Sequence, residues 1–387
     1  DLNVQNKKII LRLDLNVPIK EKVIKDYTRI DLCLPFIKEL VQKKAKIIII
    51  SHLGRPKENK DSSLSLMPIY KYLKKILQNN VYFFMGKFDD EVKDKFSHLK
   101  EGEAILIENI RFFKEEIEND DNFSKKLGSL GDIYINDAFS CSHRKQASIH
   151  KITRYVKINY AGPLLKKEIN AINLVIKNKK EPVTCIIGGS KISTKINVIT
   201  SLLEKINNLI IVGAMANNFL VYKNFKVGKS LVENDTKEII EKIYNKALEN
   251  NCEIMIPADC MVGTSFEGEG KNKDLDKIQD NEIILDIGSN TISNIKKKIE
   301  QSNTVLWNGP AGYFENENFA NGTRSIAKTI SKNTLERSLI SVLGGGDTLS
   351  AINKSKNELS FSHLSTAGGA FLEYLEGKDL PGLSVLK

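Results

Sequence analysis

The sequence has few of the residues that build disulfide frameworks, zinc sites and membrane spans. Its five cysteines are scattered, odd in number and never form a C-x-x-C pair. We therefore expect reduced thiols in a cytoplasmic protein. No apolar run reaches the roughly 18 residues that a membrane-spanning helix needs. The first residues show no apolar segment followed by a small-residue cleavage site, so we expect no secretory signal.

Concentrated positive charge is also missing, although positive charge is abundant. The 58 lysines and arginines exceed the 48 acidic residues, which gives a formal charge of +10. Such an excess favours nucleic-acid binding. However, no five basic residues are consecutive, and the single tryptophan, Trp307, lies alone in an expected strand, so no aromatic cluster could stack on bases. We expect a small anionic ligand. Nucleic-acid binding remains an alternative that a titration at two salt concentrations would distinguish.

Alternating strand and helix patterns run through the 387 residues. That length favours two domains. Short runs rich in Ile and Val predict buried strands at 8–15, 46–50, 103–108, 132–137, 183–187, 208–212, 253–257, 304–308 and 339–343. Segments with a period near 3.6 residues lie between them, including 65–78, 195–207 and 235–250. The alternation predicts an α/β fold with two doubly wound parallel-sheet, Rossmann-like domains. Residues 164–178 read as one helix that joins them.

Cationic side chains follow several strands of the first half, at the edge where open parallel sheets bind ligands. They are joined there by an aspartate and an asparagine. The candidates are Asp14, Asn16, Arg29, His52, Arg55, Arg111, His143 and Arg144. Arginine's planar guanidinium suits bidentate binding of phosphate or carboxylate. Each arginine could instead pair with a surface carboxylate, but the whole set predicts an anion-binding crevice. Asp14 and Asn16 would bind ligand hydroxyls or orient the arginines.

Glycines follow the strands of the second half. They occur at Gly188-Gly189, Gly213, Gly309–Gly312 and Gly344–Gly346. Glycine lets backbone N–H groups approach a phosphate closely, and a following helix N-terminus favours the anion. Asp347, in the last of these loops, is a candidate Mg²⁺ ligand because magnesium on nucleotide phosphates takes few protein carboxylates. Its alternative role is helix N-cap, which Thr348 could share.

The stretch CIIGGSKISTKI, residues 185–196, resembles a phosphate-binding loop without matching the P-loop motif, since no glycine immediately precedes Lys191. Lys191 and Lys195 would share a face of a helix that starts near Ile192. Two cations at a helix N-terminus oppose its dipole, at up to about 1 kcal/mol each. An anion bound between them would reverse that sign. A solvated lysine pair is the alternative.

Long motifs in a fixed order resemble the phosphoglycerate kinase family over nearly the whole chain. They are RLDLNVP, SHLGRP, ENIRFF, NDAFSCSHR, GGSKISTK, WNGPAGYFE, LGGGDT and STAGGAFLEYLEGKDLPG. The resemblance implies a 3-phosphoglycerate-binding domain at 1–160 completed by 372–387, an interdomain hinge helix at 161–179 and a nucleotide-binding domain at 180–371. It also implies a kinase that transfers a phosphoryl group between 1,3-bisphosphoglycerate and ADP. We expect a cytoplasmic monomer without nucleic-acid or membrane partners.

The resemblance also implies roles for individual residues. Asp14, Asn16, Arg29, His52, Arg55, Arg111 and Arg144 would bind 3-phosphoglycerate. Lys195, Asn308, Pro310, Glu315, Gly345, Gly346, Asp347 and Thr348 would bind ATP or ADP, with Mg²⁺ at Asp347 and the ribose at Glu315. Arg29, Lys191 and Lys195 would act at the transferred phosphoryl group. Because the attacking carboxylate is already ionised at neutral pH, no general base is required, and His52 would bind ligand. Closure about the hinge would bring the two substrates together.

Five positions depart from the family pattern. Thr194 stands where the family has Asp, and Ser140, Ala214, Ile284 and Ala367 each replace a glycine. Ala214 and Ile284 would alter the adenine pocket, while Thr194 and Ala367 lie next to the helix ends that face the phosphates. The cations and Asp347 are kept, so we expect activity with an altered nucleotide affinity. A catalytically weakened member kept for another binding role is the alternative, which a coupled assay with 3-phosphoglycerate would exclude.

Overall fold

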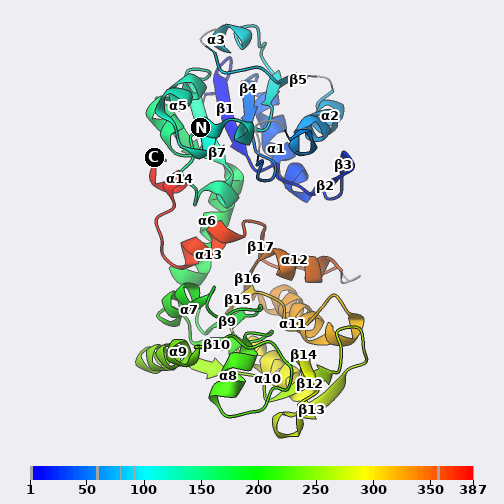
Figure 1. The fold of residues 1–387 in the computed structure, drawn as a ribbon. Helices are drawn as coiled ribbons and strands as arrows, with labels where there is room; N and C mark the ends of the chain where they lie inside the picture. The colour runs from blue at the N-terminus through cyan, green and yellow to red at the C-terminus, as the bar shows by residue number, and fades with distance from the viewer. Residues whose placement is uncertain (1–2, 58–60, 79, 90–91, 355–357, 387) are drawn as a thin grey trace. The chain divides into compact units, whose positions relative to one another are not determined.

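The computed structural model describes residues 3–57, 61–78, 80–89, 92–354 and 358–386. The chain divides into two compact units. The first unit contains Asp1–Glu168 and Asp379–Lys387, and the second contains Ile169–Lys378 (Figure 1). No helix in the described ranges combines the length and the apolar character that crossing a membrane would require.

The first unit is built on a parallel sheet of six strands in the order β5-β6-β4-β1-β7-β8. The strands are β1 (Lys8–Leu13), β4 (Lys46–Ile50), β5 (Val81–Phe84), β6 (Ala104–Ile107), β7 (Ile133–Asp137) and β8 (Ile158–Ala161). A hairpin of β2 (Ile19–Lys20) and β3 (Val23–Ile24) follows β1. The remaining elements are α1 (Thr28–Gln42), α2 (Met67–Ile76), α3 (Val92–Lys95), α4 (Lys114–Ile117), α5 (Asp121–Gly128) and α14 (Pro381–Ser384).

Both faces of this sheet are buried, which explains why its central strands are continuously apolar. Ile9 and Ile47 pack into a core that includes side chains of α1 and α2. Their neighbours Ile10 and Ile48 pack into a separate core that includes Phe123 of α5. Successive side chains of a strand point to opposite faces, so each strand supplies both cores.

The second unit also contains a parallel sheet of six strands, in the order β11-β10-β9-β15-β16-β17. They are β9 (Val183–Ile187), β10 (Asn208–Ile211), β11 (Glu253–Met255), β15 (Thr304–Asn308), β16 (Ile340–Gly344) and β17 (His363–Ser365). Its helices are α7 (Ile196–Leu203), α8 (Ala216–Tyr222), α9 (Lys237–Glu249), α10 (Ser289–Glu300), α11 (Asn321–Arg337), α12 (Gly346–Asn353) and α13 (Gly369–Leu375). Trp307 of β15 is fully buried and packs with Ile295 of α10 and Ile330 of α11.

The two parallel sheets with their helices confirm the predicted α/β class, and each predicted strand forms. Three strands of these sheets were not predicted: β5, β8 and β17. The edge strand β8 lacks buried side chains, with exposed and half-buried residues alternating along it. β17 has only three residues. An antiparallel sheet of β12 (Asp259–Gly263), β13 (Lys271–Asp274) and β14 (Ile283–Ile287) was also missed, because β13, KNKD, has no apolar residue.

The helix predicted at 164–178 is α6 (Pro163–Ile176), and the boundary between the two units falls inside it, between Glu168 and Ile169. The expected hinge spanned 161–179. The C-terminal segment of the first unit begins at Asp379, later than the expected residue 372. The preceding helix α13 stays in the second unit, where Ser201 Oγ donates a hydrogen bond to Leu375 O over 3.2 Å.

The end of the chain is bound to the first unit by backbone and side-chain contacts. Gly382 N donates to Ser142 O over 2.8 Å, and Asn136 Nδ2 donates to Gly382 O over 3.1 Å. Leu386 packs against the core that contains Ile10. These contacts join the loop after β7 to a segment that lies far away in the sequence.

Candidate active site

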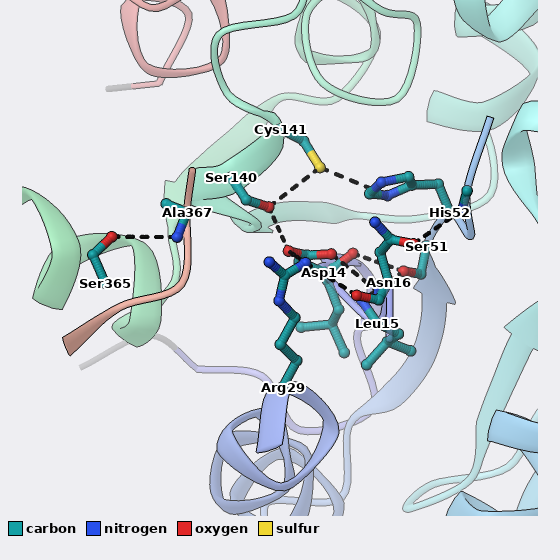
Figure 2. Close-up of polar contacts among 12 residues, drawn as sticks. Asp14, Leu15, Asn16, Arg29, Ser51, His52, Ser140, Cys141, Ser365 and Ala367 are labelled. Atoms are coloured by element: carbon teal, nitrogen blue, oxygen red, sulfur yellow. Dashed lines mark hydrogen bonds and ion pairs between the residues drawn. The ribbon is translucent and has the colours of Figure 1, made fainter. Parts of the chain in front are cut away.

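In the first unit, Asp14 lies at the centre of a polar network just beyond β1 (Figure 2). Arg29, from the first turn of α1, donates from Nη1 to Asp14 Oδ2 over 2.8 Å and to Asn16 O over 3.0 Å. Asn16 Oδ1 accepts from Gly54 N over 2.9 Å. Three predicted residues and the loop after β4 are therefore held together by direct hydrogen bonds.

Arg111 enters the same region from the loop after β6. Its Nη1 donates to Gly54 O over 2.7 Å. Burial lowers the pKa of Arg111 to about 10, so the guanidinium is charged at neutral pH. Its Nε is buried without a hydrogen-bond partner in the described part of the chain. A buried donor without a partner is costly, and the charge of this guanidinium favours an anion nearby.

His52 is buried, with 4% of its surface exposed. Its Nδ1 lies 3.4 Å from Arg12 Nη2 and 3.6 Å from Cys141 Sγ. Burial lowers the pKa of His52 well below its usual value, and the nearby arginines lower it further. The ring is therefore neutral at pH 7. It can exchange hydrogen bonds with a ligand, but its protonated form is too unfavourable for a proton shuttle.

Arg55 and Arg144 complete the predicted set with different surroundings. Arg144 is half-buried, and its charge contributes to lowering the pKa values of His52 and Arg111. Arg55 is exposed. Among the residues that the structure describes, no hydrogen bond or ion pair connects Arg55 to the other predicted substrate-binding residues. The network thus joins Asp14, Asn16, Arg29, His52 and Arg111. Arg144 acts on it through its charge.

Sequence reasoning missed Arg12, which is fully buried inside β1. Arg12 Nε donates to Ser148 Oγ over 3.0 Å, and Ser148 Oγ donates to Glu116 Oε1 over 2.6 Å. This buried series of hydrogen bonds holds Arg12 in place beside the His52 ring. A charge inside the apolar run IILRL, residues 9–13, was the available signal, because charged residues are seldom buried without a partner.

Asp14, His52 and Cys141 each place one potential metal-ligand atom within 4.8 Å of the other two. Asp14 is already paired with Arg29, and the guanidinium of Arg12 lies beside His52 Nδ1. Burial also raises the pKa of the Cys141 thiol, which disfavours the thiolate that a metal needs. The surrounding charge favours an anion over a metal ion.

Two adjoining cavities of the second unit, of about 480 and 170 Å³, share Gly189, Ser190, Pro310 and Asp347 in their walls. All eight residues predicted to bind nucleotide line one or both of them. Pro310, Glu315 and Asp347 line the larger cavity, and Lys195, Asn308, Pro310, Gly345, Gly346, Asp347 and Thr348 line the smaller. Lys191 also lines the smaller cavity.

Glycine is required where β9 and β15 end side by side. A Cβ on Gly309 would lie 2.3 Å from Gly188 O, and a Cβ on Gly188 would lie 2.2 Å from Pro310 O. Gly345, with φ of +102°, precedes α12. A Cβ on Gly346 would meet no atom within 4 Å. The N-terminus of α12 is therefore open to the smaller cavity, in the arrangement that suits a phosphate.

Lys195 lies between the ends of β9 and β15. Its Nζ donates to Gly188 O over 2.5 Å and to Asn308 Oδ1 over 2.7 Å. Burial lowers the pKa of Lys195 to about 8. Neither acceptor is a carboxylate, so within the described residues both hydrogen bonds of the ammonium go to neutral groups. The nearby Asp347 carboxylate favours the charged form, and an anion in the smaller cavity would favour it further.

The helix expected to start near Ile192 begins at Ile196, so Lys191 and Lys195 do not share a helical face. Hydrogen bonds of Ser193 and Thr194, some of them to the distant Glu233, hold the preceding residues in a turn. Ser193 donates from N and Oγ to the Glu233 carboxylate over 3.2 and 2.5 Å, and Thr194 Oγ1 donates to Lys191 O over 2.9 Å. Such side-chain bonds compete with the helical pattern. The lysines nevertheless line the same cavity.

Asp347 lies in the first turn of α12, whose N-cap residue is Gly345. The N-cap alternative for Asp347 and Thr348 is therefore wrong. Thr348 Oγ1 instead accepts from Gly309 N over 2.7 Å and donates to Gly344 O over 3.0 Å. The Asp347 carboxylate lines both cavities, and a hard oxygen donor at that place fits a nucleotide-bound Mg²⁺.

Three of the departures from the family pattern lie in the cavity walls. Ala214 and Ile284 line the larger cavity, and Thr194 lines the smaller. Sequence reasoning missed Phe266 and Tyr313 of the larger cavity, whose rings meet edge to face at 5.1 Å. It also missed Asp286 in that wall, whose pKa burial raises to about 7. Phe266 and Asp286 come from the antiparallel sheet and its loops, which strand patterns did not reveal, whereas Tyr313 lies in the loop after β15.

The comparisons with known proteins agree with one another. The phosphoglycerate kinase family model matches residues 1–378. The phosphoglycerate kinase of Wolbachia pipientis wMel is 44% identical over 387 residues, covering 100% of this chain and 97% of that protein. The phosphoglycerate kinase of Wolbachia pipientis subsp. Culex pipiens (strain wPip) is 46% identical over 380 residues. The match covers 98% of this chain and 96% of that protein. The structure of phosphoglycerate kinase from Coxiella burnetii superposes with a TM-score of 0.91 and has 40% sequence identity. The match covers 100% of this chain and 97% of that one.

These findings define the chain as a phosphotransferase that uses a carboxyl group as acceptor. It belongs to the phosphoglycerate kinase family. Its reaction is the reversible transfer of a phosphoryl group between 1,3-bisphosphoglycerate and ADP, which gives 3-phosphoglycerate and ATP.

Proposed function

We propose that the first unit binds 3-phosphoglycerate through Asp14, Asn16, Arg29, His52, Arg55, Arg111 and Arg144, and that the two cavities of the second unit bind ATP or ADP. The observation that supports this division most strongly is the pair of adjoining cavities, because they contain every residue predicted to bind nucleotide. The charged guanidinium of Arg111, held by Gly54 O beside Asn16, supports the anion site in the first unit.

The chemistry of the nucleophile explains why the chain needs no general base. The carboxylate of 3-phosphoglycerate is ionised at neutral pH, since such groups have a pKa of about 4. Catalysis then consists of positioning the ligands and offsetting negative charge on the transferred group. Arg29, Lys191 and Lys195 would supply that positive charge, and the neutral His52 would donate a hydrogen bond to ligand.

Asp347 would hold Mg²⁺, which when bound would offset charge on the nucleotide phosphates. The open N-terminus of α12 would bind phosphate oxygens through its backbone N–H groups. Glu315, in the wall of the larger cavity, would accept hydrogen bonds from the ribose hydroxyls. Lys195 would gain an anionic partner in place of its neutral ones.

Asp347→Asn should raise the Mg²⁺ concentration needed for half-maximal rate by at least about tenfold, because it removes the charged metal ligand. A coupled assay of ATP consumption with 3-phosphoglycerate measures this effect over a magnesium series. Asp274→Asn is the matched control, since Asp274 is an exposed acid paired with Lys277. An unchanged magnesium requirement in Asp347→Asn would exclude Asp347 as the metal ligand. Absence of turnover in the parent chain would favour a weakened family member.

We further propose that the two units close when both substrates are bound, since in-line transfer requires the two ligands to meet. The division of the units inside α6 supports a hinge there. Small-angle scattering should give a smaller radius of gyration with 3-phosphoglycerate and MgADP together than with either ligand alone. Identical curves in all states would contradict closure. The expectations of a monomer, a cytoplasmic location and no nucleic-acid ligand rest on the sequence alone and stay predictions.

A further inference from the structure

Ser140 adds a hydroxyl at a position where the family pattern has glycine. It lies in the short 3-10 turn Phe139–Cys141 that follows β7. Ser140 Oγ donates to Asp14 Oδ2 over 2.5 Å, and its other neighbour is Cys141 Sγ at 3.6 Å (Figure 2). The residues Asp14 and Ser140 are far apart in the sequence, so this hydrogen bond ties the loop after β7 to the loop after β1.

The Asp14 carboxylate receives three donors from three parts of the first unit. Its Oδ1 accepts from Asn16 N over 3.1 Å, and its Oδ2 accepts from Arg29 over 2.8 Å and from Ser140. An ionised carboxylate offers about four lone-pair sites. Oδ2 is thus occupied by protein donors, and the remaining site, on Oδ1, is left for a ligand hydroxyl.

A nearby serine shows what a purely structural hydroxyl does in this turn. Ser142 Oγ donates to Ala138 O over 3.1 Å and accepts from Asn136 Nδ2 over 3.2 Å. It stabilises the turn and does not contact Asp14. Ser140 donates instead to the carboxylate that Arg29 also binds. Its hydroxyl therefore acts on the expected ligand-binding group and not on the local backbone.

We propose that Ser140 is a positioning residue for the 3-phosphoglycerate site: its hydroxyl fixes the rotation of the Asp14 carboxylate, so that Oδ1 accepts from the substrate hydroxyl. The inference rests on the proposed role of Asp14 in substrate binding. Without the Ser140 donor, Asp14 keeps its bonds to Arg29 and Asn16 N, but the loop after β7 no longer restrains the carboxylate, and the substrate must complete its ordering when it binds. The cost falls on sugar-acid binding and not on nucleotide binding.

Ser140→Ala should raise KM for 3-phosphoglycerate about three- to tenfold, the range expected for one hydrogen bond, with kcat and the KM for ATP within twofold. Ser140→Thr keeps the hydroxyl and should restore most of the lost affinity. Ser142→Ala is the matched control, which should lower the melting temperature without changing the KM for 3-phosphoglycerate. An unchanged KM in Ser140→Ala, or equal defects in the Ala and Thr variants, would overturn the proposal.

The Asp14→Ala background separates this inference from the function on which it rests. If Ser140 acts through Asp14, adding Ser140→Ala to Asp14→Ala should change 3-phosphoglycerate binding, measured by calorimetry, by less than twofold. If Ser140→Ala weakened 3-phosphoglycerate binding by the same factor in the parent chain and in Asp14→Ala, Ser140 would act independently of Asp14, which would contradict the proposal. Normal 3-phosphoglycerate affinity in Asp14→Ala alone would instead overturn the proposed substrate site.

Discussion

Lys195→Ala should lower kcat by about 10²- to 10³-fold, the effect typical of removing one preorganised group that stabilises transition-state charge. The affinity for ATP should fall far less. Nζ of Lys195 is fixed by Gly188 O and Asn308 Oδ1 and lines the smaller cavity. Its position is therefore set before ligand arrives, and its charge matters most when negative charge shifts during transfer.

The kcat comes from the coupled assay, and the ATP dissociation constant comes from calorimetry without 3-phosphoglycerate. Lys205→Ala is the matched control, because Lys205 is also part-buried, lies just beyond the other end of α7 and donates to Ser201 O. The control should keep its kcat within twofold. An unchanged kcat in Lys195→Ala would exclude a role for this lysine in the transition state.

The same lysine should give ATP binding a distinctive pH dependence. Burial lowers the pKa of Lys195 to about 8 in the ligand-free chain, whereas a bound phosphate favours the charged form and raises it. Below pH 8 the lysine is already protonated, so it adds no pH dependence. Above pH 8 binding must take up a proton, and affinity should fall by up to about tenfold per pH unit. Lys195→Ala should lose this decline, and calorimetry at several pH values tests both chains.

Arg29→Ala should reduce turnover by about 10²- to 10³-fold while ADP binding stays within twofold of the parent. Arg29 belongs to the first unit, where it donates to Asp14 and Asn16, and the cavities assigned to nucleotide lie in the second unit. Its loss removes a positive charge from the substrate site and leaves the walls of the nucleotide cavities unchanged.

Steady-state kinetics and ADP calorimetry separate these effects. Lys43→Ala is the control, since it removes an exposed ion pair with Glu39 at the far end of α1. Arg29→Lys keeps a charge but not the planar guanidinium, so it should recover only part of the turnover. A collapse of ADP binding in Arg29→Ala would mean that Arg29 has been assigned to the wrong ligand.

The fold was predictable wherever burial left a simple pattern in the sequence. Strands such as β4, KIIII, are buried on both faces and therefore continuously apolar. The edge strand β8 and the polar strand β13 are exposed or half-buried, so their residues carry no such signal. The start of α7 was misplaced because Ser193 and Thr194 form hydrogen bonds that compete with the helix, one of them to the distant Glu233. Local sequence patterns cannot reveal a hydrogen-bond partner that lies so far away in the chain.

The candidate site also contains residues that the sequence predicted and residues that it did not. Glycines and cations at strand ends marked Lys195, Asp347 and Arg29 because parallel strands present their carboxyl ends at one edge. Arg12 was missed because it lies inside a strand, where its partner Ser148 comes from a remote loop. Asp286 was missed because its environment is made by burial and by the start of α11, where Gly322 N donates to it over 2.7 Å.

The sequence by itself determined the α/β class, the strand order along the chain, and the residue types that bind anions and nucleotide. These depend on periodicity and on side-chain chemistry, which are local properties. Only the tertiary structure decided that Ser140 donates to Asp14, that Arg111 Nε is buried without a partner among the described residues, and that two cavities meet at Asp347. Those facts depend on distances between segments that are remote in the chain, and folding alone sets such distances.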